Sequence, residues 1–295
     1  MRPQLVYVTP NACGAAFYKD FIIVQMLKRM GCKVVVHYHN KGVATRQDRR
    51  FDDKLYKRFF KRLKVILLSE TLYSDIQKYV SREDVRICHN GIPEIFTKEP
   101  KIKRYNDVPH ILFLSNLLES KGVIVLLDAI KILKDKGRSF VCDFVGGETA
   151  EIDVARFEQE VSTRHLADVA VYHGKKYGEE KKKYLDTADI FAFPTFYSNE
   201  CFPVVLLEAM QQCLPCVSTD EGGIPDIVEN GVTGFIVQRK DADSLAERLS
   251  LLIDNSALRE QMGINGRKKY EREFTYDKFE HNLAGILNDF ISVKY

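Results

Sequence analysis

The chain has 295 residues, of which 45% are hydrophobic and 29% are charged, and its formal net charge is +3 at pH 7. This length can bury a large core and predicts two domains, while the nearly balanced charge argues against a nucleic-acid partner. The seven cysteines are scattered and odd in number, which argues against a disulfide framework.

The N-terminal residues lead into a strand without the apolar core of a signal peptide, and no apolar run approaches the roughly 18 residues that span a bilayer. Together with the cysteine pattern, these features predict a cytoplasmic protein. Any membrane contact would then be peripheral, on the inner face of the membrane.

The first hundred residues alternate short apolar strands with helices, the pattern of a parallel sheet covered by helices. Strands are predicted near residues 5–9, 33–38, 65–69 and 85–89. Helices are predicted near residues 17–30, 48–63 and 71–79.

His37 and His39 end the second of these strands, and period-two alternation places them on one face. They could be satisfied sheet histidines, or they could line a cleft. A zinc site with Cys213 and Cys216 is a third interpretation, but a single cysteine pair without companions gives it little support, so we predict no metal site.

The basic stretch 49–64 carries Phe51, Leu55, Phe59 and Leu63 at four-residue spacing. A helix of this kind could lie on an anionic membrane, where a lipid-linked substrate would be found. A helix that packs on its own sheet shows the same apolar stripe, so both interpretations stay open.

The second half predicts one complete doubly wound α/β domain. Its strands are predicted near residues 110–115, 139–145, 169–173, 190–194, 215–219 and 234–237. Its helices are predicted at about residues 121–136, 151–164, 178–187, 203–212, 225–229 and 242–253.

Two carboxylates lie near the start of a helix predicted to begin at Pro203, a residue that suits the first helical position. Glu200 lies on the preceding loop. Because helical side chains lean toward the N-terminus, Glu208 can point toward the same helix mouth. The unpaired N–H groups there favour an anion, so the pattern suits a ligand with both hydroxyl and phosphate groups.

These residues resemble the retaining nucleotide-sugar glycosyltransferases of family 4, also called glycosyl transferases group 1. The carboxylate pair matches the signature of that family, and residues 221–237 match the segment that follows it. Three further motifs fall in the family's order, at 90–92, 113–123 and 144–147. The resemblance covers about residues 85–295, and it implies the GT-B fold of two Rossmann-like domains that face a cleft.

The resemblance also implies the domain organisation. Residues 1–100 would form an acceptor-side Rossmann-like domain, and 101–275 the domain that binds the nucleotide sugar. Residues 276–295 would form a helix that crosses back to the first domain. The strand at 5–9 resembles a middle strand of the family's N-terminal domain, so that domain is expected to be incomplete.

The resemblance assigns roles to individual residues. Glu200 would hold hydroxyls of the donor sugar, Glu208 the ribose diol, and Lys121 the diphosphate, while His39 would line the acceptor side. Glu200, His39 and Lys121 are therefore the predicted catalytic residues. The predicted donor-binding residues are Asn116, Lys121, Gly146, Gly147, Lys175, Tyr177, Glu200, Cys201, Phe202, Pro203 and Glu208.

Two positions depart from the family pattern. The family usually has an arginine where this chain has Asn116, which can donate hydrogen bonds but carries no charge. The family often has glycine before Phe202, where this chain has Cys201, interpreted as a tolerated small residue and not a nucleophile.

The predicted function is transfer of a hexose from a nucleoside diphosphate sugar to a saccharide or lipid-linked saccharide, with retention of anomeric configuration. The expected pathway is surface polysaccharide or glycolipid synthesis, without a metal or other cofactor. The alternative is a non-catalytic or partner-dependent module that binds nucleotide sugar. A glycosidase would also use two carboxylates, but it would not need Lys121 or the glycine turn at 221–223.

Overall fold

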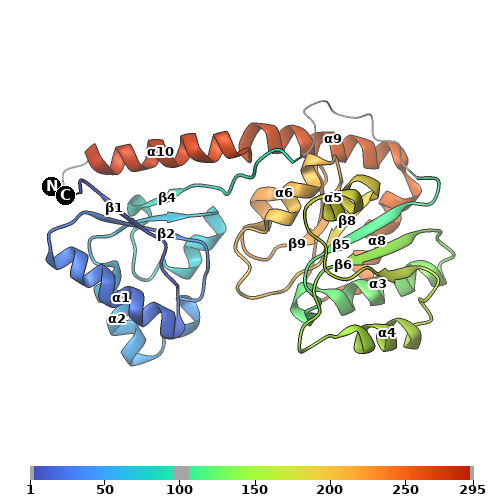
Figure 1. Cartoon of the computed structure of the whole chain (residues 1–295), viewed down its shortest axis with the longest axis horizontal. Coiled ribbons are helices and arrows are strands. Elements are labelled where there is room, and N and C mark those ends of the chain that lie inside the picture. Colours follow the sequence, from blue (N-terminus) through green and yellow to red (C-terminus); the bar gives the residue numbers. More distant parts are fainter. Residues whose placement is uncertain (1–2, 96–105, 293–295) are drawn as a thin grey trace. The chain divides into compact units, whose positions relative to one another are not determined.

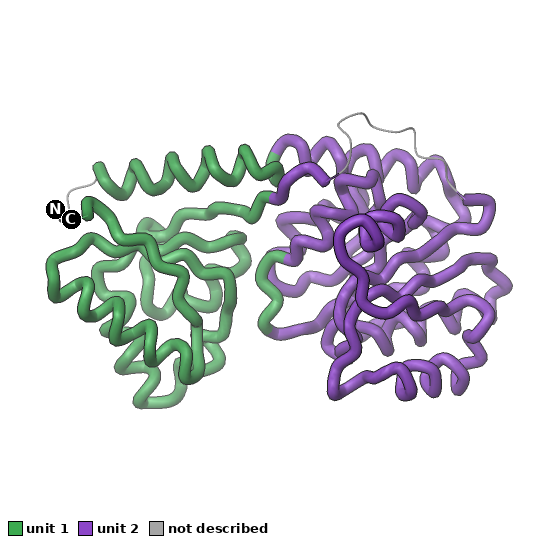
Figure 2. Tube along the Cα trace, viewed as in Figure 1, with its two compact units in different colours: residues 1–91, 199–202, 273–295 green, residues 92–198, 203–272 purple. Residues whose placement is uncertain are grey.

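The computed structural model describes residues 3–95 and 106–292. The chain divides into two compact units (Figure 2). Unit 1 is formed by residues 1–91, 199–202 and 273–295, and unit 2 by residues 92–198 and 203–272. The predicted domain boundary at residue 100 lies outside the described residues.

Unit 1 is built on a parallel four-stranded sheet in the order β1-β2-β3-β4. Its strands are β1 (Val6–Val8), β2 (Val34–Tyr38), β3 (Lys64–Leu67) and β4 (Val85–Ile87). Its α-helices are α1 (Gly14–Arg29), α2 (Arg50–Phe60) and α10 (Tyr276–Ser292). Figure 1 shows α1 and α2 on one face of this sheet and α10 on the other.

The apolar stripe of the basic stretch is mainly a packing surface. Phe59 and Leu63 are fully buried, and Phe51 alone of the four is strongly exposed, at 67%. The ring of Phe59 lies 5.4 Å from that of Phe17 on α1. The helix therefore uses its stripe to pack within unit 1, as the second interpretation predicted.

Helix α10 covers the other face of the unit 1 sheet. Its Phe290 is buried in a core cluster with Val35, Ile66 and Cys88. Leu283 and other residues of α10 pack against that cluster. Val35 lies on β2, Ile66 lies on β3, and Cys88 directly follows β4.

The predicted helix at 71–79 is wrong, because the chain forms a 3-10 helix over Glu70–Asp75 there. Ser69 caps its start by accepting a hydrogen bond from the backbone N–H of Thr71 at 3.2 Å. Beyond it, Ile76 and Tyr79 bond three residues back, to Tyr73 and Ile76, while Gln77 and Val80 each bond four residues back without a continuous α-helix. These tight turns replace the α-helical pattern. Further 3-10 helices cover Ala44–Arg46, Arg82–Asp84 and Glu119–Lys121.

Unit 2 is built on a parallel six-stranded sheet in the order β10-β9-β8-β5-β6-β7. Its strands are β5 (His110–Leu114), β6 (Val141–Val145), β7 (Ala170–Tyr172), β8 (Ile190–Phe193), β9 (Cys216–Thr219) and β10 (Gly234–Val237). All six predicted strands of this half are present, with ends that differ by at most two residues. Nearly every strand residue is buried, which fits a sheet covered on both faces.

Helices lie on both faces of the unit 2 sheet (Figure 1). They are α3 (Val123–Asp135), α4 (Val154–Thr163), α5 (Gly178–Thr187), α6 (Val204–Gln211), α7 (Ile224–Ile227), α8 (Ala242–Asp254) and α9 (Ser256–Glu273). Strand β5 pairs with β6 on one side and with β8 on the other. Chain order therefore reverses at β5, and ligands of such sheets bind at the carboxyl ends of the strands beside that reversal.

Helix α9 was not predicted. Its buried positions carry glycines and charged residues, including Gly263, Gly266 and Arg267, so the sequence lacks an apolar stripe. Arg267 is satisfied by two hydrogen bonds to Glu94, at 2.7 and 3.1 Å, and by one to the backbone oxygen of Gln211. Within the described ranges, no helix is both long enough and apolar enough to cross a membrane.

Candidate active site

Three loops at the carboxyl ends of β5, β6 and β7 meet around Gly147. The backbone N–H of Gly147 donates to Oδ1 of Asn116, which follows β5, at 3.3 Å. A Cβ on Gly147 would lie 3.1 Å from that oxygen and 3.5 Å from Cδ of Lys175, which follows β7. The structure thus brings together three of the predicted donor-binding residues at the edge where α/β sheets bind ligands.

Gly146 is required by the close approach of these loops. A Cβ there would lie 1.7 Å from the backbone oxygen of Ser115, so no side chain fits. Its N–H donates to the oxygen of Gly174 at 3.0 Å, and its oxygen accepts from the Tyr172 hydroxyl at 2.9 Å. The turn therefore has a clear structural role besides any contact with a ligand.

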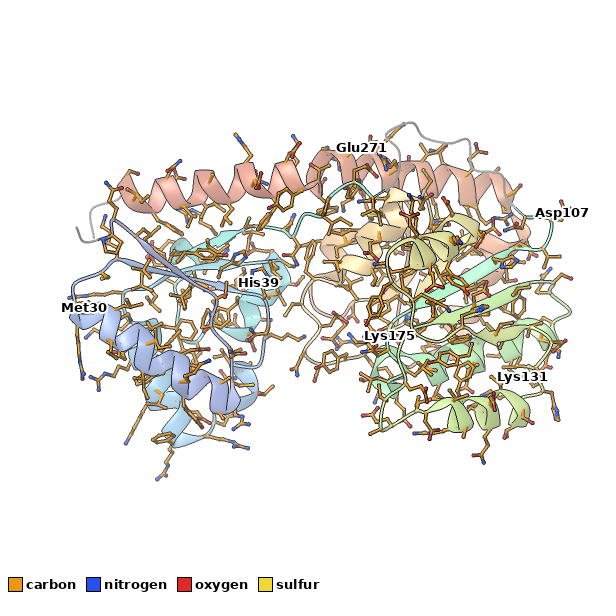
Figure 3. All side chains as sticks on the ribbon, viewed as in Figure 1. Met30, His39, Asp107, Lys131, Lys175 and Glu271 are labelled. Carbon is orange, nitrogen blue, oxygen red and sulfur yellow. The ribbon has the colours of Figure 1, made fainter. Side chains whose placement is uncertain are left out.

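Lys175 and Tyr177 form an exposed pair after β7. The Lys175 Nζ lies 4.9 Å from the centroid of the Tyr177 ring. Tyr177 is 65% exposed and directly precedes α5. Figure 3 labels Lys175, whose side chain is among the exposed ones of unit 2.

Lys121 ends the 3-10 helix before α3 and lies over two aromatic rings. Its Nζ is 4.5 Å from the ring centroid of Tyr197 and 5.6 Å from that of Phe193. Gly122 has φ +89°, and a Cβ there would lie 2.2 Å from the oxygen of Pro194. The loops after β5 and β8 are therefore packed together, and the aromatic rings orient the ammonium group. Sequence reasoning missed Tyr197, although an aromatic pair after β8 was a visible signal.

Glu208 lies on α6 with one carboxylate oxygen bound and the other unsatisfied. Oε1 accepts a hydrogen bond from Lys181 Nζ on α5 at 2.6 Å. Oε2 is buried, and no donor among the described residues reaches it. Buried carboxylate oxygens normally have partners, so this oxygen is suited to receive a hydroxyl from a ligand. Lys181 was missed because nothing in its lysine-rich surroundings indicates which lysine meets Glu208.

Pro203 precedes α6 and does not occupy its first helical position. Its ψ of 110° is extended, so it is the N-cap residue and the helix begins at Val204. The prediction was wrong by one residue. The N–H groups of the first turn still follow it.

Residues 199–202 belong to unit 1, where Glu200 and Cys201 are buried. Glu200 is 8% exposed. The Sγ of Cys201 lies 3.7 Å from the backbone oxygen of Asn199, a contact of a packed side chain.

Phe202 is fixed by two aromatic contacts within unit 1. Its ring stacks on His89 with 5.4 Å between centroids and meets the edge of Phe274 at 5.8 Å. His89 and Phe274 also contact each other, at 5.6 Å. This cluster anchors the segment that carries Glu200, and the sequence did not indicate it.

His39 follows β2 and is exposed, whereas His37 is fully buried. Their ring centroids lie 4.3 Å apart, which confirms that they share a face (Figure 3 labels His39). His37 Nδ1 pairs with the Tyr7 hydroxyl at 2.6 Å, and its Nε2 has no hydrogen-bond partner within the described part of the chain. Burial and the neighbouring His39 lower the pKa of His37 to about 3, and partial desolvation of its ring lowers the pKa of the more exposed His39.

The sequence did not indicate a polar cluster that lies at the start of the loop after β7. Asp143 on β6 is 9% exposed and binds His110 Nδ1 at 2.8 Å and His173 Nε2 at 2.6 Å. His173 also lies against Tyr184 of α5, with 4.6 Å between ring centroids. This cluster holds the start of the loop that carries Lys175.

Residues 3–95 and 106–292 contain no cluster of three or more histidine, cysteine, aspartate or glutamate side chains that could hold a metal ion. All seven cysteines are described, and none of them forms a disulfide bond. Cys216 is buried in β9.

Solved structures share the fold of this chain. Sucrose-phosphate synthase of Thermosynechococcus elongatus superposes with a TM-score of 0.80 at 20% identity, covering 99% of this chain and 74% of that one. HepE of Anabaena, solved in complex with UDP, superposes with a TM-score of 0.81 at 17% identity, covering 97% of this chain and 78% of HepE. These likenesses confirm the predicted α/β fold of GT-B type.

Proteins of similar sequence are glycosyltransferases too. The amylovoran biosynthesis glycosyltransferase AmsK of Erwinia amylovora is 31% identical over 268 residues, which cover 88% of this chain. The match spans 65% of the length of AmsK. Residues 94–269, more than half of the chain, match the family described as glycosyl transferases group 1. The chain therefore belongs to the family of glycosyl transferases group 1.

Proposed function

We propose that this chain transfers a hexose from a nucleoside diphosphate sugar to a saccharide or lipid-linked saccharide, with retention, in the synthesis of a surface polysaccharide or glycolipid. Membership of glycosyl transferases group 1 supports the class of reaction. The name of AmsK, an amylovoran biosynthesis enzyme, supports the pathway. The UDP complex of HepE supports a nucleoside diphosphate as the donor leaving group.

The observation that carries the proposal is the buried, unsatisfied Oε2 of Glu208. A buried acceptor without a donor costs about 1–3 kcal/mol, which a ligand hydroxyl would offset. The ribose of a nucleotide supplies two adjacent hydroxyls. In this proposal the loops around Gly147 and the ammonium of Lys121 receive the diphosphate.

In the reaction, the bond between the anomeric carbon and the diphosphate oxygen breaks while the acceptor oxygen bonds to the same face of the sugar. The proton of the acceptor hydroxyl passes to the departing diphosphate oxygen. Negative charge grows on the departing diphosphate, and the cation of Lys121 stabilises it more in the transition state than in the ground state. Glu200 holds hydroxyls of the donor sugar. His39 is proposed to contact the acceptor. Desolvation lowers the pKa of His39, so its imidazole is neutral at pH 7 and can accept a hydrogen bond from a hydroxyl.

The test is calorimetric titration with UDP and GDP, together with an assay for sugar release from the corresponding donors. Glu208→Ala should weaken nucleotide binding about tenfold or more, since it removes a charged hydrogen-bond acceptor. Glu158→Ala, an exposed glutamate on α4, serves as the matched control and should bind like the wild type.

Nucleotide binding with slow sugar release would support the transferase and justify a search for the acceptor. Binding without turnover would contradict it and identify a binding module. Failure of the wild type to bind either nucleotide would overturn the donor site.

A further inference from the structure

The ion pair between Lys181 and Glu208 joins α5 to α6 in a partly buried position. Their Nζ and Oε1 atoms lie 2.6 Å apart, and their side chains are only 26% and 13% exposed. Both helices are eight residues or longer and flank the same sheet. A charged pair in such a position is held in a narrow range of geometries, because both stems are packed.

The pair uses only one of the two carboxylate oxygens. Oε2 of Glu208 is buried, and within residues 3–95 and 106–292 it has no hydrogen-bond partner. If the role of Glu208 were only to neutralise Lys181, its second oxygen would be expected to face water or a second donor. The lysine therefore fixes the carboxylate through Oε1 and leaves Oε2 as a buried acceptor to which no described residue donates.

We propose that Lys181 is a positioning residue, which holds Glu208 so that Oε2 accepts a hydrogen bond from a vicinal diol, the ribose of the nucleotide. This inference rests on the proposed function, because it refines the site that binds the donor. Lys181 itself does not touch the diol. Without it, Glu208 gains a second unsatisfied oxygen and can turn to satisfy either one elsewhere, which removes the acceptor from its position.

Neighbouring lysines on α5 provide the matched control. Lys182 pairs with Glu179 on the same helix at 3.7 Å. Lys183 lies on the same helix and is exposed. Lys183→Met thus removes the same charge from the same helix while leaving Glu208 unaltered.

The experiment compares ligands with and without the diol. Binding of UDP and GDP is measured beside their 2′,3′-dideoxy analogues for the wild type, Lys181→Met, Lys183→Met and Glu208→Gln. The ratio of the two affinities reports the diol contact alone, since base and diphosphate are common to both ligands. We expect a ratio of about tenfold or more in the wild type and in Lys183→Met, the size of one hydrogen bond to a charged group.

In Lys181→Met the ratio should fall to about one- to threefold, while affinity for the dideoxy analogue stays within about threefold of wild type. A merely structural lysine would weaken both ligands equally and leave the ratio unchanged, which would overturn the inference. If Lys181→Met does not fold, as judged by circular dichroism, Lys181→Gln is used, and the same fall in ratio is required.

The controls separate this inference from the proposed function. If the wild type binds neither nucleotide, the donor site itself is wrong and both proposals fail. If the wild type binds and Glu208→Gln abolishes the ratio while the Lys181 variant keeps it, the proposed function stands and the role of Lys181 is refuted. A wild type that binds both forms equally would also refute it.

Discussion

At the scale of residues, the chain shows which functional groups can be recognised locally and which cannot. Glu208 stood out because Leu206, Leu207, Ala209 and Met210 surround it with apolar neighbours, and the structure does bury its second oxygen. Its partner Lys181 is 27 positions away, so no spacing rule connects the two. Asn116 and Gly147 were each recognised from a motif, and the hydrogen bond between them came only from the packed loops.

The buried His37 predicts a loss of stability in mild acid. Its folded-state pKa of about 3 lies below the unfolded value of about 6.5, so below pH 6.5 the unfolded chain binds one more proton. The contribution of neutral His37 to the free energy of unfolding is complete above pH 6.5 and is lost as the pH falls toward 3. Between pH 7.5 and 5 this single group should lower the free energy of unfolding by about 2 kcal/mol.

His37→Asn should remove that part of the pH dependence, as measured by urea unfolding at the two pH values. Asparagine can still accept the hydrogen bond from Tyr7, so the fold should persist. His281→Asn changes an exposed histidine on α10 and should keep the wild-type dependence. Identical pH dependence in His37→Asn and the wild type would contradict the prediction.

At the scale of elements, period and composition predicted most strands and helices, and the exceptions have identifiable causes. The segment 71–79 has helix formers, yet Ser69 caps a run of three-residue turns and the chain stays in a 3-10 helix. Helix α9 escaped prediction because glycine reads as a helix breaker in sequence. Here Gly263 allows close packing, since a Cβ there would lie 1.9 Å from the backbone oxygen of Cys213.

Replacement of two helical glycines by alanine should therefore change the stability of the chain in opposite directions. Gly263→Ala should destabilise the chain by about 1–3 kcal/mol, because the added methyl group overlaps a backbone atom that cannot move freely. Gly285→Ala on α10 should stabilise it by about 0.5–1 kcal/mol, because nothing lies within 4 Å and alanine favours the helix. Thermal unfolding of both variants measures the two changes in stability. Destabilisation by Gly285→Ala would show the reasoning to be wrong.

At the scale of the whole molecule, the chain comprises two compact units, each with its own parallel sheet and buried core. Unit 1 draws on both ends of the chain, since α10 supplies Phe290 to a core that also contains Val35. Unit 2 carries Lys121, Gly147 and Glu208, the residues proposed to bind the nucleotide. The match to AmsK spans 65% of that relative, so the activity assigned to the chain stays a proposal.

Separate cores predict two calorimetric transitions that respond to different changes. A nucleoside diphosphate at 100 times its Kd should stabilise unit 2 by about 2.7 kcal/mol and leave unit 1 unaltered. Phe290→Ala should destabilise unit 1 by about 3–5 kcal/mol through the cavity it creates, whereas Asn288→Ala on the exposed side of α10 should have little effect. A single transition shifted by both the ligand and Phe290→Ala would refute independent unfolding.

The sequence by itself determined the parallel α/β class, the order of elements in the second half and the positions of the family motifs. These depend on local features, since periodicity, turn residues and fixed spacings act within a few residues of one another. The tertiary structure alone decided that Lys181 binds Glu208, that Tyr197 lies under Lys121 and that Tyr7 pairs with the buried His37. Such contacts join elements far apart in the chain, and they depend on how helices and strands pack and not on the propensity of any one segment.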